Sequence, residues 1–189
     1  MAMTDFNNRD PFTSLTSPII PFLRDNLRAD LVTGPLPRGG GVIFPDFRKI
    51  PASNQAAQSV FDWKMFEGAA MLLVGENFGH GKHATSAVLR LLASGIRVVL
   101  GVSFADEFAQ AAARHGLLSI EAPRDFLDDL AEEALVGEAV TVDLPAQTVT
   151  THRGYQSTFD VDTELKGRLL EGDTDLTNDG HFLYVAEAM

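Results

Sequence analysis

The sequence predicts a mixed α/β fold, because buried strand-like runs alternate with helix-like runs in the middle of the chain and short β-prone runs follow one another near its end. Residues 69–100 read as a strand, a glycine-rich turn, a helix and a second strand. Such a unit predicts two parallel strands joined by a right-handed crossover. The chain of 189 residues suits one compact domain with a sizeable core. We therefore expect a flexible N-terminal tail over residues 1–12 and a single domain over residues 13–189.

The first third of the chain is broken by prolines and glycines. Residues 14–23 are apolar but contain Pro18 and Pro21, and proline cannot donate to a sheet ladder, so we expect an irregular edge strand there. Residues 33–41 are too rich in glycine and proline for regular structure and predict a loop. This loop is either a plain surface connection or a mobile segment that contacts the substrate side chain and sets specificity.

The middle of the chain has the clearest pattern. Residues 69–74 are continuously apolar between two glycines, which predicts a strand buried on both faces. After the turn 75–83, the apolar face of residues 84–93 predicts a helix, and Gly95 follows at the position where glycine ends helices. Residues 96–100 predict the second buried strand.

Two more helices and an antiparallel meander complete the prediction. Ser103 is expected to cap a helix over residues 104–114, which Gly116 ends. A further helix is expected over residues 124–135. Short β-prone runs separated by turn signals then predict antiparallel strands at 139–144, 148–152 and 155–161.

Charge and composition exclude several classes of function. The net charge of −11 would repel a nucleic acid. No apolar run approaches the roughly 18 residues that a membrane helix requires, and residues 1–5 do not resemble a signal peptide, so we expect a cytoplasmic protein without a membrane contact. The sequence contains no cysteine, which excludes disulfides, thiolate zinc sites and an iron–sulfur cluster held by this chain.

The turn at 75–83 is the best candidate for a binding site. It reads Gly-Glu-Asn-Phe-Gly-His-Gly-Lys-His and leads directly into a helix. A helix N-terminus offers free N–H groups and a positive partial charge, and glycines let a ligand approach the backbone. Lys82 and His83 add cationic side chains to this position. The pattern therefore fits an anion, either a phosphate or a dicarboxylate.

Other interpretations of the same turn are weaker. Gly79 and Gly81 lack the third glycine of a dinucleotide-binding fingerprint, and Lys82 is not followed by the hydroxyl residue of a phosphate-binding P-loop. His80 and His83 are three residues apart but have no third ligand at a convincing spacing for zinc. A structural turn with exposed Lys82 and His83 remains an alternative.

Several motifs resemble one known family. The stretch 75–81 is similar to the signature loop of isopropylmalate dehydratase small subunits and of the aconitase swivel domain. The resemblance continues through residues 94–99, 103–108 and 115–118. It includes the opening motif from Pro21 to Asp30 and a closing motif over residues 169–177. The motifs span residues 20–177 in the family's order.

The resemblance implies a β/β/α swivelling domain, as in the aconitase C-terminal domain. It also implies a large-subunit partner carrying a [4Fe–4S] cluster, with no cofactor bound by this chain. The implied reaction is loss and addition of water on a hydroxy-dicarboxylate, such as 3-isopropylmalate or a related di- or tricarboxylate. The small subunit would hold substrate carboxylates and complete the site.

The binding loop departs from the family pattern. The family continues Gly-Ser-Ser-Arg-Glu-His-Ala where this chain reads Gly-Lys-His-Ala-Thr-Ser-Ala over residues 81–87, and Arg28 replaces an aspartate of the opening motif. Three explanations remain open: a different substrate, a catalytically silent paralogue that acts as a binding or regulatory partner, or a compensating change in the large subunit.

We expect the following site residues on this basis. Lys82 and His83 bind substrate carboxylates, and His83 is the candidate general acid or base. Backbone N–H groups of residues 79–81 are the expected anion donors, so Gly79, His80 and Gly81 are included as substrate-binding residues. Arg24 is a further candidate for a carboxylate contact, with a buried structural ion pair as its alternative. Asp30 is expected to be structural.

Overall fold

The computed structural model describes residues 11–33 and 64–172. Seven strands belong to one mixed sheet, in the order β4-β3-β2-β1-β5-β6-β7. Their bounds are β1 Ser14–Phe22, β2 Met71–Val74, β3 Val98–Gly101, β4 Leu118–Glu121, β5 Ala139–Asp143, β6 Thr148–Thr150 and β7 Gln156–Thr158. The helices are α1 Ala29–Thr33, the 3₁₀ turn η2 Lys64–Phe66, α3 Ala84–Ala93, α4 Asp106–His115, α5 Arg124–Ala134 and α6 Thr163–Glu171.

Strand β1 is the central strand of the sheet, so its prediction as an edge strand is wrong. Its first half, Ser14 to Pro18, pairs antiparallel with β5, and its second half, Ile19 to Phe22, pairs parallel with β2. Each half is therefore paired on one side, and a proline in either half can turn its missing N–H toward the unpaired side. This change of partner allows a proline-containing strand to occupy the middle of the sheet.

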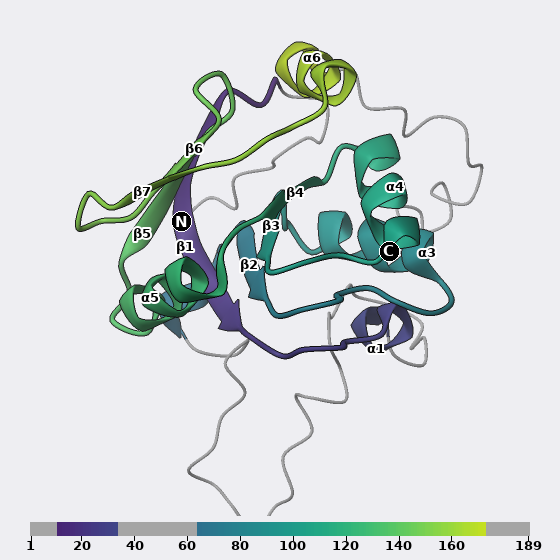
Figure 1. The fold of residues 1–189 in the computed structure, drawn as a ribbon, viewed down its shortest axis with the longest axis horizontal. Coiled ribbons are helices and arrows are strands. Elements are labelled where there is room, and N and C mark those ends of the chain that lie inside the picture. Colours follow the sequence, from purple (N-terminus) through teal and green to yellow (C-terminus); the bar gives the residue numbers. More distant parts are fainter. Residues whose placement is uncertain (1–10, 34–63, 173–189) are drawn as a thin grey trace, which may run out of the picture.

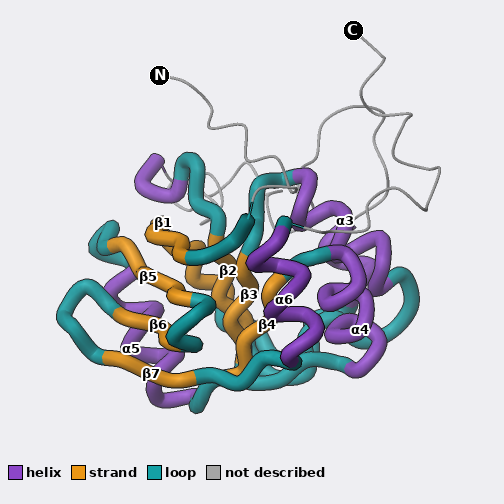
Figure 2. The backbone as a smooth tube through the Cα atoms, turned by 90° about the horizontal axis from the view of Figure 1, so that it is seen from above, coloured by secondary structure: helices purple, strands orange, loops and turns teal. Residues whose placement is uncertain are grey.

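The parallel half of the sheet, β1 to β4, forms the core of the molecule. Strands β2 and β3 are buried at every position, as the predicted double-faced burial requires. Helices α3 and α4 pack together on one side of the sheet, whereas α5 contacts β1 on the other side (Figures 1 and 2). The mixed α/β class is confirmed.

Most of the predicted elements are confirmed within a few residues. Helix α3 begins at Ala84 and ends at Ala93, as predicted. Gly116 ends α4 with a positive φ of 75°. The strands β5, β6 and β7 pair antiparallel in sequence order, which confirms the meander.

Ser103 does not cap α4, which is a correction. Helix α4 begins later, after Ala105, and Ala105 makes no side-chain capping bond. Ser103 instead accepts a hydrogen bond from a residue of the loop 75–83, as described below. Helix α6 was not predicted, although Asp162 caps it by accepting bonds from the N–H groups of Glu164 and Leu165.

Some predicted features lie outside the described residues. These are most of the tail 1–12, the loop 33–41 apart from its first residue, and the end of the closing motif 169–177.

Phe12, which was expected in the tail, is buried, and its N–H donates to the carbonyl oxygen of Leu169 at 2.8 Å. Phe12 therefore packs against the described part of the chain.

Candidate functional site

The loop 75–83 follows the carboxyl end of β2 and is held between two neighbouring segments. One segment, residues 24–28, follows β1, and the other, residues 102–105, follows β3. Because β1, β2 and β3 are parallel, all three segments leave the same edge of the sheet. Ligands of open α/β sheets bind at this edge.

Backbone hydrogen bonds fix the loop on both sides. Toward the segment after β1, the N–H of Gly79 donates to Leu27 at 2.8 Å, and the carbonyl oxygen of His80 accepts from Ala29 at 2.9 Å. Toward the segment after β3, Phe78 donates to Ser103 at 3.1 Å and accepts from Ala105 at 3.0 Å. The loop therefore has a defined shape even though much of it faces solvent.

Side chains reinforce the same arrangement. The N–H of Asn77, whose φ is 50°, donates to Oγ of Ser103 at 2.9 Å, and its side-chain amide donates to Oδ1 of Asn26 at 3.0 Å. Nε2 of His80 lies 2.9 Å from the carbonyl oxygen of Asn26. A carbonyl oxygen only accepts, so Nε2 must carry the hydrogen. His80 thus anchors the loop, in addition to any contact with a ligand.

Phe78 and Gly79 attach the loop to the core. The Phe78 ring is fully buried and meets the rings of Phe104 and Phe108 edge to face, with centroids 6.3 and 5.0 Å away. Gly79 has a φ of 82°, and a methyl group added to it would come within 2.5 Å of the Phe108 ring. The N–H of Gly79 is already bonded to Leu27, so the expectation that this group donates to an anion is corrected. Gly79 has a structural role here.

The tip of the loop, residues 81–83, is exposed. Gly81, Lys82 and His83 all face solvent, and no described acidic side chain pairs with Lys82. His83 is the N-cap of α3 in the left-handed conformation, with φ 74° and ψ 28°, and makes no side-chain capping bond. The first turn of α3 contains no acidic residue. The positive end of this helix therefore coincides with two basic side chains.

An arginine–aspartate pair lies beside this tip. Nε and Nη2 of Arg28 donate to the two carboxylate oxygens of Asp30, both at 2.9 Å. The hydrogen bonds from Arg28 hold the pKa of Asp30 below its usual value, and the nearby charge of His83 acts in the same direction. A methyl group built on Gly81 would lie 3.9 Å from Nε of Arg28. Arg28 is thus close to the loop tip, and Asp30 is paired as its structural prediction requires.

Arg24 follows the end of β1 and lies beside the first residue of the loop rather than beside its tip. Its carbonyl oxygen accepts from the N–H of Gly75 at 3.2 Å, and its guanidinium lies 5.5 Å from the centre of the Phe22 ring. The side chain is exposed, so the alternative of a buried ion pair is wrong. Next to it, Asp25 accepts from the N–H of Glu76 and from Arg124, each at 2.8 Å, and these bonds lower the pKa of Asp25.

Three residues that build the site were not predicted as site residues from the sequence: Asn26, Arg28 and Ser103. Asn26 and Arg28 belong to the opening motif, but only the structure shows that this motif runs beside the loop. Ser103 stands where a helix cap was expected, and that local signal concealed its longer-range bond to Asn77. Pairing between segments that are 26 or more residues apart has no local sequence signal.

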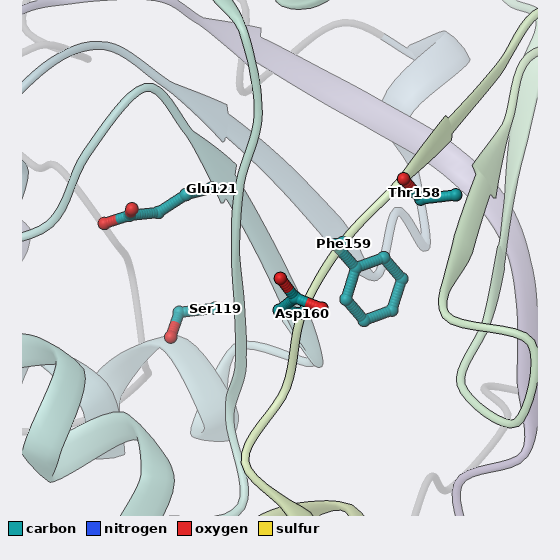
Figure 3. A pocket seen from close by; sticks show the side chains of 5 residues that line it. All are labelled: Ser119, Glu121, Thr158, Phe159 and Asp160. Atoms are coloured by element: carbon teal, nitrogen blue, oxygen red, sulfur yellow. The ribbon is translucent and has the colours of Figure 1, made fainter.

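A cavity of about 420 Å³ lies elsewhere, between the two edges of the curled sheet. It is lined by Ser119 and Glu121 of β4, and by Thr158, Phe159 and Asp160 at the end of β7 (Figure 3). None of these residues belongs to the loop 75–83. Residues 81–83 are exposed, so enclosure of a ligand at the cationic tip requires something to cover it.

The described residues give two further findings about ligands and membranes. Over residues 11–33 and 64–172, no group of three or more histidine or acidic side chains is arranged to hold a metal ion. Within the same ranges, no helix combines the length and apolarity needed to cross a bilayer.

Comparison with known protein families gives two matches along the chain. Residues 47–125 match the aconitase C-terminal domain, and residues 128–163 match a family described as LeuD_N. The first match contains the whole loop 75–83 and α3.

Individual relatives cover most of the chain. The 3-isopropylmalate dehydratase small subunit of Cereibacter sphaeroides is 32% identical over 177 residues, which is 87% of each chain. That of Phenylobacterium zucineum is 34% identical, over 83% of this chain and 75% of the relative. Among solved structures, the 3-isopropylmalate dehydratase (LeuD) of Methanocaldococcus jannaschii is similar with a TM-score of 0.57 and 19% identity, covering 85% of this chain and 90% of that one. The likeness of fold confirms the predicted swivel-type architecture.

Proposed function

The chain belongs to the family of 3-isopropylmalate dehydratase small subunits, and from this premise we propose that it is the small subunit of a hydro-lyase. Together with a large subunit it removes and re-adds water on 3-isopropylmalate or a closely related hydroxy-dicarboxylate. The chain's own part is to bind the substrate carboxylates. The single observation that supports this role is the exposed cationic tip, residues 81–83, at the start of α3.

The charge distribution supports an anionic substrate at this tip. Lys82 has no acidic partner among the described residues, although the chain carries a net charge of −11. An anion here gains from the positive end of α3 and from both basic side chains. His83 follows in the same turn, and imidazole is the side chain that enzymes use most often for general acid or base catalysis. We propose Lys82 as a carboxylate-binding residue and His83 as the general acid or base.

The open position of the tip supports dependence on a partner. Elimination of water from a dicarboxylate requires an enclosed site, and residues 81–83 are exposed. Since this chain has no cysteine, the thiolate ligands of a [4Fe–4S] cluster would come from the large subunit. When bound, such a cluster supplies a Lewis acid for the departing hydroxyl group. The swivel domain would close over it and carry the carboxylate-binding loop to the substrate.

Reconstitution with the large subunit tests this proposal. The two chains are co-expressed and purified without oxygen, and interconversion of 3-isopropylmalate and its 2-isomer is followed through the absorbance of the unsaturated intermediate. We expect turnover by the pair and none by either chain alone. A correctly assembled pair with an intact cluster that binds the dicarboxylate but never turns it over would instead identify a silent paralogue.

A further inference from the structure

We propose that Arg28 is a substrate-binding residue, whose guanidinium binds the second carboxylate of the dicarboxylate while Lys82 binds the first. This inference rests on the proposed function, because it assigns one more contact within the same site. It is based on the position of Arg28 against the loop, on its exposure, and on the donors that remain after its pairing with Asp30.

Arg28 is fixed to the loop through its backbone. It forms an isolated parallel bridge with His80, and the residues on either side of Arg28 both bond to the loop: Leu27 accepts from Gly79, and Ala29 donates to His80. The side chain then reaches the tip, since Nε lies 3.9 Å from the position of a methyl group on Gly81. Arg28 therefore keeps its place relative to residues 81–83.

The guanidinium has donors left for a ligand. Its side chain is 56% exposed, and Asp30 uses Nε and Nη2. Arginine carries five N–H groups in a planar fork, so three of them remain after the two bonds to Asp30: both of Nη1 and one of Nη2. Lys82 is a compact point charge and cannot make the planar, parallel two-point contact of a guanidinium.

The other arginines that the structure describes near this edge, Arg24 and Arg124, are less suited to bind a carboxylate. Arg124 is bonded to Asp25 and forms a second ion pair with Asp128. The guanidinium of Arg24 lies over the ring of Phe22, the last residue of β1, and its carbonyl oxygen bonds to Gly75 at the start of the loop. Among the arginines of residues 11–33 and 64–172, Arg28 is the one that comes within 4 Å of a methyl group built on Gly81. The substrate's two carboxylates would thus lie on either side of the loop tip.

The experiment measures binding of 3-isopropylmalate to the assembled two-subunit complex by calorimetry, alongside kcat and KM. The variants are Arg28→Ala, Arg28→Lys and Asp30→Asn, with Arg114→Ala, an exposed arginine at the far end of α4, as the matched control. We expect Arg28→Ala to raise Kd and KM roughly 10-fold or more, and Arg28→Lys to restore little. Asp30→Asn should leave Kd unchanged or lower it, because it releases donors of Arg28. Arg114→Ala should match the wild type.

Two results would overturn the assignment. One is a wild-type Kd in Arg28→Ala. The other is an equal rise of Kd in Arg28→Ala and Asp30→Asn, since a purely structural pair is lost to the same extent from either side. Failure of the proposed function is separate: it appears as wild-type complex that binds the ligand without turnover, and the Kd comparison still decides the role of Arg28. A wild-type complex that does not bind the dicarboxylate overturns both.

Discussion

Gly79 lies against the ring of Phe108, with room for a hydrogen atom but not for a methyl group. A Cβ at this position would come within 2.5 Å of the ring, and its φ of 82° also disfavours any other residue. This contact joins the binding loop to α4, so the position of the cationic tip depends on it.

Gly79→Ala is therefore expected to destabilise the protein by about 3 kcal/mol, from overpacking together with backbone strain. Gly95→Ala is the matched control, because Gly95 has a similar φ of 88° but nothing within 4 Å of its added methyl group. The control should cost about 1 kcal/mol, from the backbone alone. Equal losses of the free energy of unfolding in urea titrations would show that the Phe108 contact has no effect.

Ser103→Ala is expected to loosen the loop without unfolding the protein. It removes the acceptor of the Asn77 N–H, a bond of 2.9 Å that contributes about 1 kcal/mol. Hydrogen exchange should accelerate at Asn77 and the residues that follow it. In Ser157→Ala, whose hydroxyl only reaches its neighbour's carbonyl oxygen at 3.5 Å, exchange in the loop should stay at the wild-type rate. Unchanged exchange in Ser103→Ala would contradict the anchoring role.

Asp25→Asn is expected to lower Tm by up to about 4 °C at pH 7, because Asp25 accepts from the Glu76 N–H and from Arg124. These bonds lower the pKa of Asp25 below 3.8, its ordinary value. The ionised form therefore stabilises the folded state above pH 3.8, and this contribution is lost as the pH falls through the lowered pKa. The Tm difference from the wild type should shrink toward zero in acid. A Tm difference that is constant with pH would contradict this origin. Asp129→Asn, at an exposed position of α5, is the control.

His83→Asn isolates the chemistry of the imidazole from the shape of the backbone. His83 has φ 74° and ψ 28°, a left-handed conformation that asparagine adopts readily. If His83 transfers the proton, kcat of the assembled enzyme should fall by about 100-fold or more, while the apparent Tm stays unchanged. A raised KM with an unchanged kcat would assign His83 to carboxylate binding alone.

The sequence predicted those parts of the fold that depend on local signals. Helix α3 was bounded correctly because its apolar face and Gly95 are local features. Strand β1 was predicted at the edge of the sheet because proline is unfavourable in a strand that is paired on both sides. In the structure β1 changes its partner at Ile19, so each of its prolines lies in a half that is paired on one side. Which strand pairs with each half of β1 depends on the fold of the whole chain and cannot be predicted from local sequence.

For the candidate site, too, the sequence predicted the local features but not the contacts between distant segments. The anion-binding character of Lys82 and His83 could be inferred from the turn and the helix that follows it. The bonds that shape the loop, from Asn26, Leu27 and Ser103, join distant segments and appeared only in the structure. For that reason Gly79 was mistaken for an anion donor.

The measurement that tests the central claim most directly compares Lys82→Ala with Lys64→Ala in the assembled two-subunit enzyme. Lys64 is an exposed lysine of η2, which precedes β2, at the opposite end of that strand from the loop. We expect Lys82→Ala to raise KM for 3-isopropylmalate roughly 10-fold or more, and Lys64→Ala to leave it unchanged. Full turnover and an unchanged KM in Lys82→Ala would contradict a carboxylate site at the start of α3.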